Sequence, residues 1–257
     1  MPKIADRQSK QAAPHPPLTG YYQSEGQRRS FLNKVFNQTA THYDRIDRMM
    51  SLGSGPWYRR TALKRAGLAP GMQHLDVAVG TGAVARSAVE IVGETGSVIG
   101  LDPSIGMLKQ TVAAIRLPVI QGVAERLPFP DGRFDFLSMG YALRHVADLD
   151  VTFAEYFRVL KPGGALLILE FARPKSRLGY ALGRFYLNKL VPWVSQLGSG
   201  SKEARLLMEY CWDTVNNCVP ADTILTAMQR AGFEQIKYRT WFGVFSEYRA
   251  RKPAAGR

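Results

Sequence analysis

The chain has 257 residues, of which 46% are hydrophobic and 21% charged, and its formal net charge is +13. This is the balance of a globular protein long enough for a sizeable core, and it excludes a disordered, collagen-like or coiled-coil chain. The apolar runs are too short for a membrane-spanning helix, the first residues lack a signal-peptide core, and two cysteines favour a reducing cytoplasm over a disulfide framework.

The first 66 residues predict a tail followed by two helices. Residues 1–27 are rich in Pro, Gln and Ser and lack apolar periodicity, so we expect a flexible basic tail. Residues 28–50 and 57–66 have helical apolar spacing and are separated by a Gly- and Ser-rich break. We expect these two helices to form an N-terminal lid over residues 28–66.

After Gly71, short apolar runs alternate with helical patterns. The sequence predicts strands at 74–79, 97–102, 117–122, 133–140 and 165–171, and helices at 83–92, 104–114 and 150–160. This alternation is typical of a parallel sheet covered by helices on both faces. Further along the chain we expect a helical insert at 175–218, a helix at 220–231 and two strands within 235–250. Residues 28–257 would then form a single domain.

Charge is unevenly distributed along the chain. The net charge is +8 in residues 1–65, −3 in residues 66–170 and +8 in residues 171–257. Basic flanks favour an anionic partner, such as a membrane surface, nucleic acid or an anionic substrate, and they also fit an ordinary basic enzyme. The sequence has no known nucleic-acid-binding signature, and its four histidines are too scattered to indicate a metal site.

The strongest chemical signal is LDVAVGTG at residues 75–82, where a strand leads through Gly80 and Gly82 into a helix. Glycine allows a ligand close to the backbone, and the helix N-terminus offers unpaired N–H groups. Asp102, twenty residues after Gly82, is placed to accept both hydroxyls of a ribose. This pattern fits either a nicotinamide dinucleotide or S-adenosylmethionine. Asp76 favours S-adenosylmethionine, because a carboxylate there suits an ammonium or a loop amide rather than a pyrophosphate.

Several further segments resemble class I S-adenosylmethionine-dependent methyltransferases, and among them the ubiquinone/menaquinone biosynthesis C-methyltransferase family. The resemblance covers about residues 31–252, and the segments that carry it are 36–44, 51–53, 75–83, 100–108, 124–130, 134–135, 142–144 and 158–164. It implies S-adenosylmethionine as the cofactor and an α/β, Rossmann-like class I methyltransferase fold. Such a fold has a mainly parallel seven-stranded sheet with helices on both faces, here with a helical insert before the last helix and strands.

The resemblance also implies a cofactor site. Thr81 and the glycines beside it would line the methionine part, and Asp102 would hold the ribose. The other implied positions would contact the adenine or lie near the sulfonium, and they are Met107, Val123, Ala124 and Gly140. No metal is expected.

Three residues are candidates for catalysis. A ring carbon becomes nucleophilic when an adjacent hydroxyl loses its proton, which calls for a base or a stabilising cation. Arg144 would stabilise the phenolate or orient a water, or else cap a turn or pair with Asp148. His145 titrates in the right range for a base, and Tyr43 lies on the helix expected to close over the cofactor. Both of these side chains also fit packing roles.

The sequence departs from the family's usual residues at several positions. Val79, Ala83 and Gly140 stand where the family usually has Gly, an acid and Ser. At 141–145 the family's Phe-Gly and Asn are replaced by Tyr141-Ala142 and His145, and the usual terminal phrase differs at 247–251. We expect these last two segments to lie near the acceptor.

These observations predict an S-adenosylmethionine-dependent C-methyltransferase whose acceptor is apolar and aromatic or lipid-like, resembling a quinol precursor. The aromatic insert would wall the acceptor pocket. We expect a cytoplasmic protein that contacts anionic membranes peripherally, and its oligomeric state is left open. Alternative acceptors are a specialised-metabolite phenol, a lipid, or a prenyl diphosphate held by Arg173, Lys175 and Arg177. A nucleic-acid-binding protein and a nicotinamide enzyme are distant alternatives.

Overall fold

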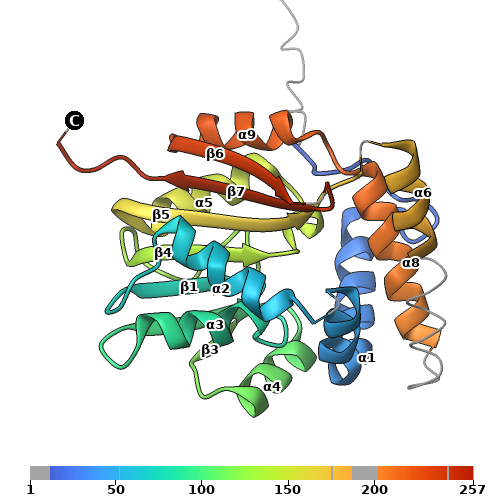
Figure 1. The fold of residues 1–257 in the computed structure, drawn as a ribbon, viewed down its shortest axis with the longest axis horizontal. Coiled ribbons are helices and arrows are strands. Elements are labelled where there is room, and N and C mark those ends of the chain that lie inside the picture. Colours follow the sequence, from blue (N-terminus) through green and yellow to red (C-terminus); the bar gives the residue numbers. More distant parts are fainter. Residues whose placement is uncertain (1–11, 52, 175, 187–201, 242, 257) are drawn as a thin grey trace, which may run out of the picture.

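A sheet of seven strands, in the order β3-β2-β1-β4-β5-β7-β6, forms the centre of the computed structural model (Figure 1). The parallel strands are β1 (Gln73–Val77), β2 (Ser97–Asp102), β3 (Val119–Gln121), β4 (Phe134–Gly140) and β5 (Leu160–Phe171). Strand β7 (Phe245–Arg251) is antiparallel to both β5 and β6 (Glu234–Trp241). The structure describes residues 12–51, 53–174, 176–186, 202–241 and 243–256. The predicted fold class is confirmed.

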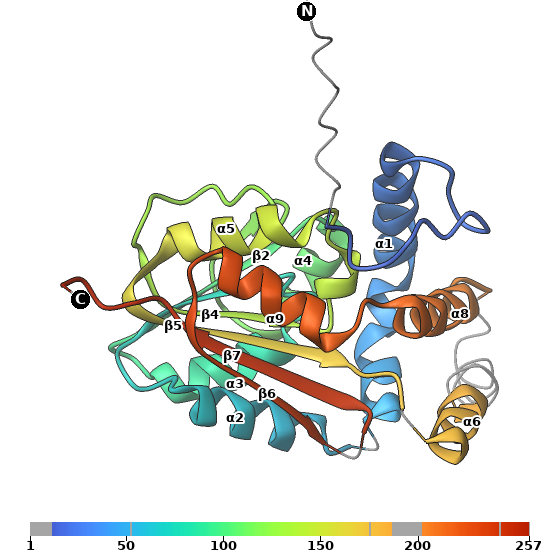
Figure 2. The ribbon, with the colours of Figure 1, turned by 90° about the horizontal axis from the view of Figure 1, so that it is seen from above.

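Helices cover both faces of the sheet (Figure 2). Helices α2 (Gly55–Ala66) and α3 (Ala83–Val92) pack on one face, while α5 (Leu149–Val159) and α9 (Ala221–Arg230) pack on the other. Helix α4 (Ile105–Ala114) packs against β2 and β3. Because both faces are covered, the central strands are buried along most of their length, as their apolar runs predict.

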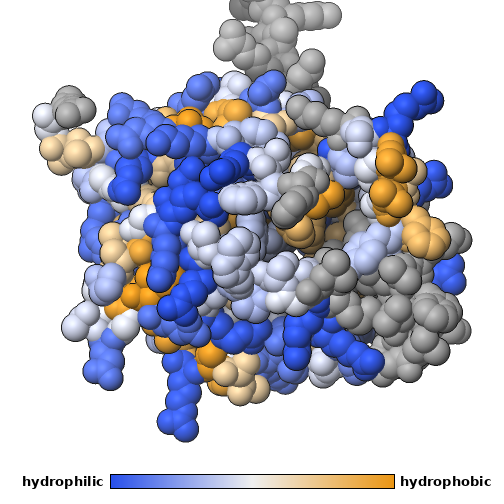
Figure 3. Space-filling view, viewed as in Figure 1, coloured by the Kyte–Doolittle hydropathy of each residue, from blue (hydrophilic) through white to orange (hydrophobic). Residues whose placement is uncertain are grey.

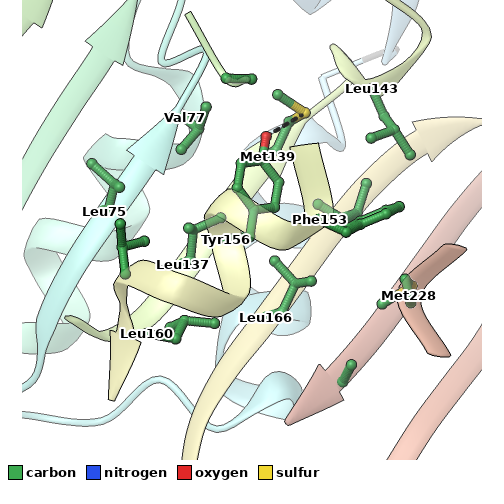
Figure 4. Close-up of a cluster of buried hydrophobic side chains, with 14 of the residues drawn as sticks. Leu75, Val77, Leu137, Met139, Leu143, Phe153, Tyr156, Leu160, Leu166 and Met228 are labelled. Carbon is green, nitrogen blue, oxygen red and sulfur yellow. Dashed lines mark hydrogen bonds between the residues drawn. The ribbon is translucent and has the colours of Figure 1, made fainter. Parts of the chain in front are cut away.

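The core between the sheet and α5 is filled by large side chains (Figure 4). Phe153 and Tyr156 of α5 are fully buried against β4 and β5. The Tyr156 hydroxyl donates to the Met139 sulfur at 3.4 Å, so its polar atom has a partner inside the apolar core. This packing fixes β4, whose carboxyl end carries the segment 140–145.

Three helices lie together beyond the end of the sheet, as Figures 1 and 2 both show. They are α1 (Glu25–Met50), α6 (Arg177–Phe185) and α8 (Lys202–Asn217). Helix α1 contacts both α4 and α8, so the helices before and after the sheet segments meet there. The predicted helical insert is confirmed for α6 and α8, while residue 175 and residues 187–201 lie outside the described residues.

Residues 12–24 differ from the predicted flexible tail. The Ala12 N–H donates to Asp148 at 3.2 Å, and the Ala12 carbonyl accepts from Leu149 at 2.9 Å. The Tyr21 hydroxyl donates to Asp213 at 2.7 Å. Residues 12–24 contain no helix, in line with their composition, but an irregular segment is still held when its backbone groups find partners. Residues 1–11 of the predicted tail lie outside the described residues.

We predict that Phe153→Ala lowers the free energy of unfolding by about 3–5 kcal/mol, because it leaves a cavity under the sheet. Val151, two residues earlier, is 47% exposed, so Val151→Ala should change this free energy by less than about 0.5 kcal/mol. Urea denaturation of both variants measures the difference. Equal effects would contradict the assignment of the α5 core face.

Candidate functional site

A cavity of about 210 Å³ lies where the parallel strands end, enclosed by the loops after β1, β2 and β4 and by helix α1. Most of the residues predicted from the sequence lie on its wall, and these are Tyr43, Gly80, Thr81, Asp102, Met107, Val123, Ala124, Gly140 and His145. Three predicted residues, Asp76, Gly82 and Arg144, lie behind the wall that the described residues form. The carboxyl ends of parallel strands are the expected ligand position in this class of sheet.

The loop after β1 depends on its glycines. Gly80 and Gly82 have φ angles of +59° and +84°, which side-chain-bearing residues rarely adopt. A Cβ on Gly82 would lie 3.0 Å from the Ile115 side chain, so Ile115 would have to shift if residue 82 carried a side chain. A Cβ on Gly80 would meet only the Ala78 carbonyl at 4.0 Å, which leaves the cavity side of the loop open to a ligand.

Asp102 joins two loops at the cavity wall. One carboxylate oxygen accepts from the Gly80 N–H at 2.9 Å and the other from the Ser104 N–H at 2.8 Å. Burial raises the pKa of Asp102 to about 6, although both N–H groups favour the ionised form. A carboxylate has about four acceptor sites, so capacity remains for two ribose hydroxyls.

Asp76 lies beneath the loop in a buried polar chain. Its Oδ1 accepts from the Ser138 hydroxyl at 2.6 Å, and that hydroxyl lies 2.8 Å from His74 Nε2. Burial raises the pKa of Asp76 to about 7, and its Oδ2 has no hydrogen-bond partner within the described part of the chain. Asp76 therefore supports the floor of the loop rather than its cavity face.

Helix α1 is tied to both cofactor loops by polar side chains that sequence reasoning missed. Asn37 Oδ1 accepts from the Gly106 N–H at 2.7 Å and from the Ser104 hydroxyl at 2.9 Å. Asp44 accepts from the Thr81 hydroxyl and pairs with Arg86 at 3.1 Å. Asn37 and Asp44 are seven residues apart and so share one helix face, which is the signal that could have identified them.

The segment 141–145 and helix α1 form an aromatic wall opposite the glycine loop. Tyr141 has a φ of +60°, a strained conformation for a bulky residue. The His145 ring stacks on Tyr210 at 5.6 Å and meets the Phe36 ring edge-on at 5.5 Å. Burial, followed by the positive charges of Arg144 and Arg28, holds the pKa of His145 well below 6.5. His145 is therefore neutral over the physiological range.

Arg59 of α2 is a buried cation on the cavity wall, and sequence reasoning missed it. Its side chain is 4% exposed, pairs with Asp47 of α1 and lies 5.6 Å from the centre of the Tyr141 ring. Its Nε has no hydrogen-bond partner among the described residues. Burial lowers the pKa of Arg59, but the Asp47 carboxylate together with Tyr141 and Tyr43 more than offsets this, so the pKa is raised overall. The signal was an arginine on the apolar face of a helix, since the neighbouring α2 positions 58, 62 and 63 are buried.

One hypothesis from the sequence was that Arg144 pairs with Asp148, and the structure shows a different partner. Its guanidinium pairs with Glu170 at 2.9 Å and donates to the Thr214 hydroxyl at 3.2 Å and the Tyr141 carbonyl. Asp148 instead caps α5. Both members of the Arg144–Glu170 pair are about 5% exposed, and Arg144 borders a smaller cavity between Tyr43, His145 and α8. Arg144 is therefore not on the wall of the larger cavity, and its partner Glu170 comes from β5, which a local sequence pattern cannot show.

Two other groups of residues expected near the acceptor lie away from both cavities. Residues 247–251 lie in β7, paired with β5 and β6, and border neither cavity. Arg173 and Arg177, proposed as diphosphate ligands, are exposed and also border neither cavity. Lys175 lies outside the described residues. No group of three His, Cys, Asp or Glu side chains suited to a metal occurs in the described ranges.

Comparison with known proteins identifies a family for this arrangement. The model of the ubiE/COQ5 methyltransferase family matches residues 23–252. A relative from Shewanella pealeana, named ubiquinone/menaquinone biosynthesis C-methyltransferase UbiE, is 34% identical over 85% of this chain and 89% of its own length. A relative of the same name from Pseudoalteromonas translucida is 33% identical over 86% of this chain and 89% of its own.

Solved structures share the fold. A methyltransferase from Thermotoga maritima, described as a possible histamine N-methyltransferase, matches with a TM-score of 0.61 at 22% identity, over 86% of this chain and 99% of its own. A phosphoethanolamine N-methyltransferase from Haemonchus contortus in complex with S-adenosyl-L-methionine matches with a TM-score of 0.62 at 20% identity, over 88% of this chain and 60% of its own. Both confirm the Rossmann-like class I fold.

The residues present fit S-adenosylmethionine, the cofactor that the sequence predicts. Asp102 retains acceptor capacity for ribose hydroxyls, and the backbone at Gly80 is open on the cavity side. Met107, Val123 and Ala124 supply an apolar wall suited to an adenine ring. The site needs no metal to hold this ligand.

We predict that cofactor affinity falls as the pH is lowered through about 6, because protonation of Asp102 removes charge-assisted acceptors for the ribose. Asp102→Asn should bind S-adenosylmethionine about 10- to 100-fold more weakly above this pH and should lose the part of the pH dependence that is centred near pH 6. Calorimetric titration of both proteins between about pH 5 and about pH 8 tests this. An unchanged profile in the variant would contradict the ribose assignment.

We also predict that Arg144→Met lowers the free energy of unfolding by about 3–5 kcal/mol, because it leaves Glu170 buried without its partner. The double variant Arg144→Met/Glu170→Met replaces the pair with apolar side chains and should recover most of this loss. Urea denaturation of the two variants gives the comparison. If the double variant is no more stable than the single one, the unpaired charge of Glu170 is not the cause of the lower free energy of unfolding.

Proposed function

The chain belongs to the ubiE/COQ5 methyltransferase family, and we propose that it methylates a ring carbon of an apolar aromatic acceptor of the quinol-precursor type. The observation that carries this proposal is one continuous cavity with two unlike walls. One wall has the ribose-binding carboxylate of Asp102, while the other is aromatic and contains the buried cation of Arg59.

The methyl donor needs little activation by the protein, whereas the acceptor needs both positioning and activation. S-adenosylmethionine supplies a methyl group that its sulfonium already activates. The protein must hold the acceptor carbon in line with that methyl group, and effective positioning accounts for much of the rate. It must also favour the ionised phenol, because the phenolate makes the adjacent ring carbon nucleophilic.

The acceptor ring is proposed to lie among Phe36, Tyr43, Tyr141 and His145. These side chains come from α1 and the segment after β4, and together they border the larger cavity. The Phe36 ring packs against Tyr43 at 6.3 Å and edge-on against His145 at 5.5 Å, so these side chains form one apolar aromatic surface on the cavity wall. Burial raises the pKa of Tyr43, so its hydroxyl remains protonated and serves as a hydrogen-bond donor rather than a base.

Arg59 is proposed to stabilise the developing phenolate. Its guanidinium is always charged and borders the cavity. Among the described residues, Asp47 is the one carboxylate that forms an ion pair with it. A fixed cation in a buried site is more effective than a solvated one, because little screening water lies between it and the developing charge.

His145 is proposed to accept a hydrogen bond from the acceptor hydroxyl, but not to take up the hydroxyl proton as a base. Its low pKa means that an imidazolium beside Arg144 and Arg28 is unfavourable. The family usually has Asn at this position, which can also accept a hydrogen bond but cannot act as a base. The hydroxyl proton is then released to water. Once the carbon–methyl bond has formed and the sulfur–methyl bond has broken, the ring carbon loses its own hydrogen to water as a proton, which restores the aromatic ring.

Arg144 is proposed as a positioning residue. It holds the Tyr141 carbonyl and Glu170, so it fixes the turn that presents Tyr141 and His145 to the cavity. Because Tyr141 and His145 replace the family's usual residues, the ring substituents of the acceptor are proposed to differ from those of the curated relatives. A specialised-metabolite phenol therefore remains the second candidate. The acceptor of either kind is proposed to be met at a membrane surface by an otherwise cytoplasmic protein.

The experiment that tests the function is transfer of a labelled methyl group from S-adenosylmethionine. The acceptors are demethylated benzoquinols and naphthoquinols with short and long apolar tails, compared with a panel of simple phenols. Label in a carbon–methyl bond of a quinol supports the proposal. Label only on oxygen, or only in the simple phenols, would overturn it.

We predict that Arg59→Met lowers kcat by about 100-fold, in line with the loss of one preorganised electrostatic group, and leaves cofactor affinity unchanged. Arg59→Lys should retain part of the activity because the charge remains. The control is Arg60→Met, since Arg60 is 47% exposed and pairs with Glu90 on the surface. Similar kcat values for the two methionine variants would remove Arg59 from the proposed mechanism.

A further inference from the structure

Helix α6 has two unlike faces. On its inner face the Tyr180 ring lies 5.3 Å from the Trp212 ring of α8, and the Tyr180 hydroxyl donates to Asn216 at 3.0 Å. On its outer face Leu178, Leu182 and Phe185 are 71%, 59% and 60% exposed. Apolar side chains gather over α6 on the surface, with hydrophilic ones beside them (Figure 3).

The exposed side chains form a continuous stripe. Leu178, Leu182 and Phe185 are spaced four and three residues apart, so they lie above one another on one side of the helix. Single exposed apolar residues are ordinary, but a helix with its large apolar side chains on the outside is typical of a surface that meets an apolar partner. Since the inner face already packs on α8, the stripe is not an unfilled part of the core.

The charge around this stripe indicates what the partner is. Residues 171–202 contain six Lys or Arg and no Asp or Glu. Two of these, Arg177 and Arg184, lie exposed on α6 itself. An apolar stripe among basic side chains fits the interface of an anionic bilayer, where the stripe enters the boundary of the acyl chains and the arginines meet lipid phosphates. No described helix is long and apolar enough to cross a membrane, so contact through α6 would be at the surface.

The stripe lies close to the acceptor wall. Helix α8 packs on α6 through Trp212, while Leu207, Met208 and Cys211 of α8 border the smaller cavity beside Tyr43 and His145. One helix, α8, therefore lies between the exposed stripe and the aromatic wall. An acceptor with an apolar tail, dissolved in the bilayer, would pass only this helix on its way from a membrane at α6 to the aromatic wall.

We propose that α6 is an interfacial helix that docks the enzyme on anionic bilayers by inserting Leu178, Leu182 and Phe185. This inference rests on the proposed function, because it assigns the surface through which a lipid-soluble acceptor is reached. It adds to the general effect of the basic flanks a defined apolar contact, which salt does not screen.

The first test is sedimentation of the full chain with vesicles. The vesicles are phosphatidylcholine alone or equal parts of phosphatidylcholine and phosphatidylglycerol. Leu178→Ser/Leu182→Ser should bind the anionic vesicles about 10- to 100-fold more weakly, given the apolar area that two leucines bury. The matched control is Val112→Ser/Val151→Ser, because these valines are 53% and 47% exposed on α4 and α5. The control should bind like the unmodified protein.

The second test separates this inference from the proposed function. The leucine variant should keep its kcat with a water-soluble, short-tailed quinol and lose activity with a long-tailed quinol held in vesicles. If the unmodified protein methylates no quinol but the vesicle results hold, the proposed function fails and the interfacial helix stands. Equal vesicle binding by the leucine and valine variants overturns the inference. So does a dimer that only the leucine substitutions dissociate, since a second copy then covers the stripe.

Discussion

The carboxylate of Asp102 holds together the two loops on which the site depends. It receives the Gly80 N–H from the loop after β1 and the Ser104 N–H from the loop after β2. The Ser104 hydroxyl continues the connection to Asn37 of α1. A single buried acid thus sets the distance between the glycine loop, the start of α4 and the helix that covers them. Burial raises the pKa of Asp102 to about 6, so protonation of this one carboxylate affects both the connection between the loops and the ligand site.

Buried charge is handled differently on the two sides of the cavity. The cofactor side contains two acids, Asp76 and Asp102, whose pKa values are raised by burial, and hydrogen bonds from neutral N–H and O–H groups offset this only in part. The acceptor side contains cations, each paired with one carboxylate: Arg59 with Asp47 and Arg144 with Glu170. A buried cation needs a partner to remain charged at acceptable cost. The proposed mechanism uses this permanent positive charge to stabilise the ionised phenol, while His145 remains neutral beside it.

The helices outside the sheet connect this chemistry to the surroundings. Helix α1 closes the cofactor loops, α8 borders the acceptor side, and α6 carries the exposed apolar stripe. These elements belong to the parts of the chain that flank the regular alternation of strands and helices, where the net charge is most positive. In the proposed function these helices meet the cofactor, the acceptor and the membrane, which fits the general rule that function depends on sites added to a fold and not on the fold itself.

The sequence by itself determined the fold class, nearly every strand and the positions of the glycine loop and Asp102, because these depend on local periodicity and on a spacing that a parallel sheet imposes. It also singled out Tyr43 and His145, both of which border the cavity. Only the tertiary structure decided which charges meet. Glu170 reaches Arg144 from β5, Asp47 reaches Arg59 from another helix, and residues 12–24 find partners far along the chain. Such pairs depend on packing between distant segments, and no local pattern encodes them. The same holds for the face of α6, since the helix is visible in the sequence but the side left uncovered depends on where α8 packs.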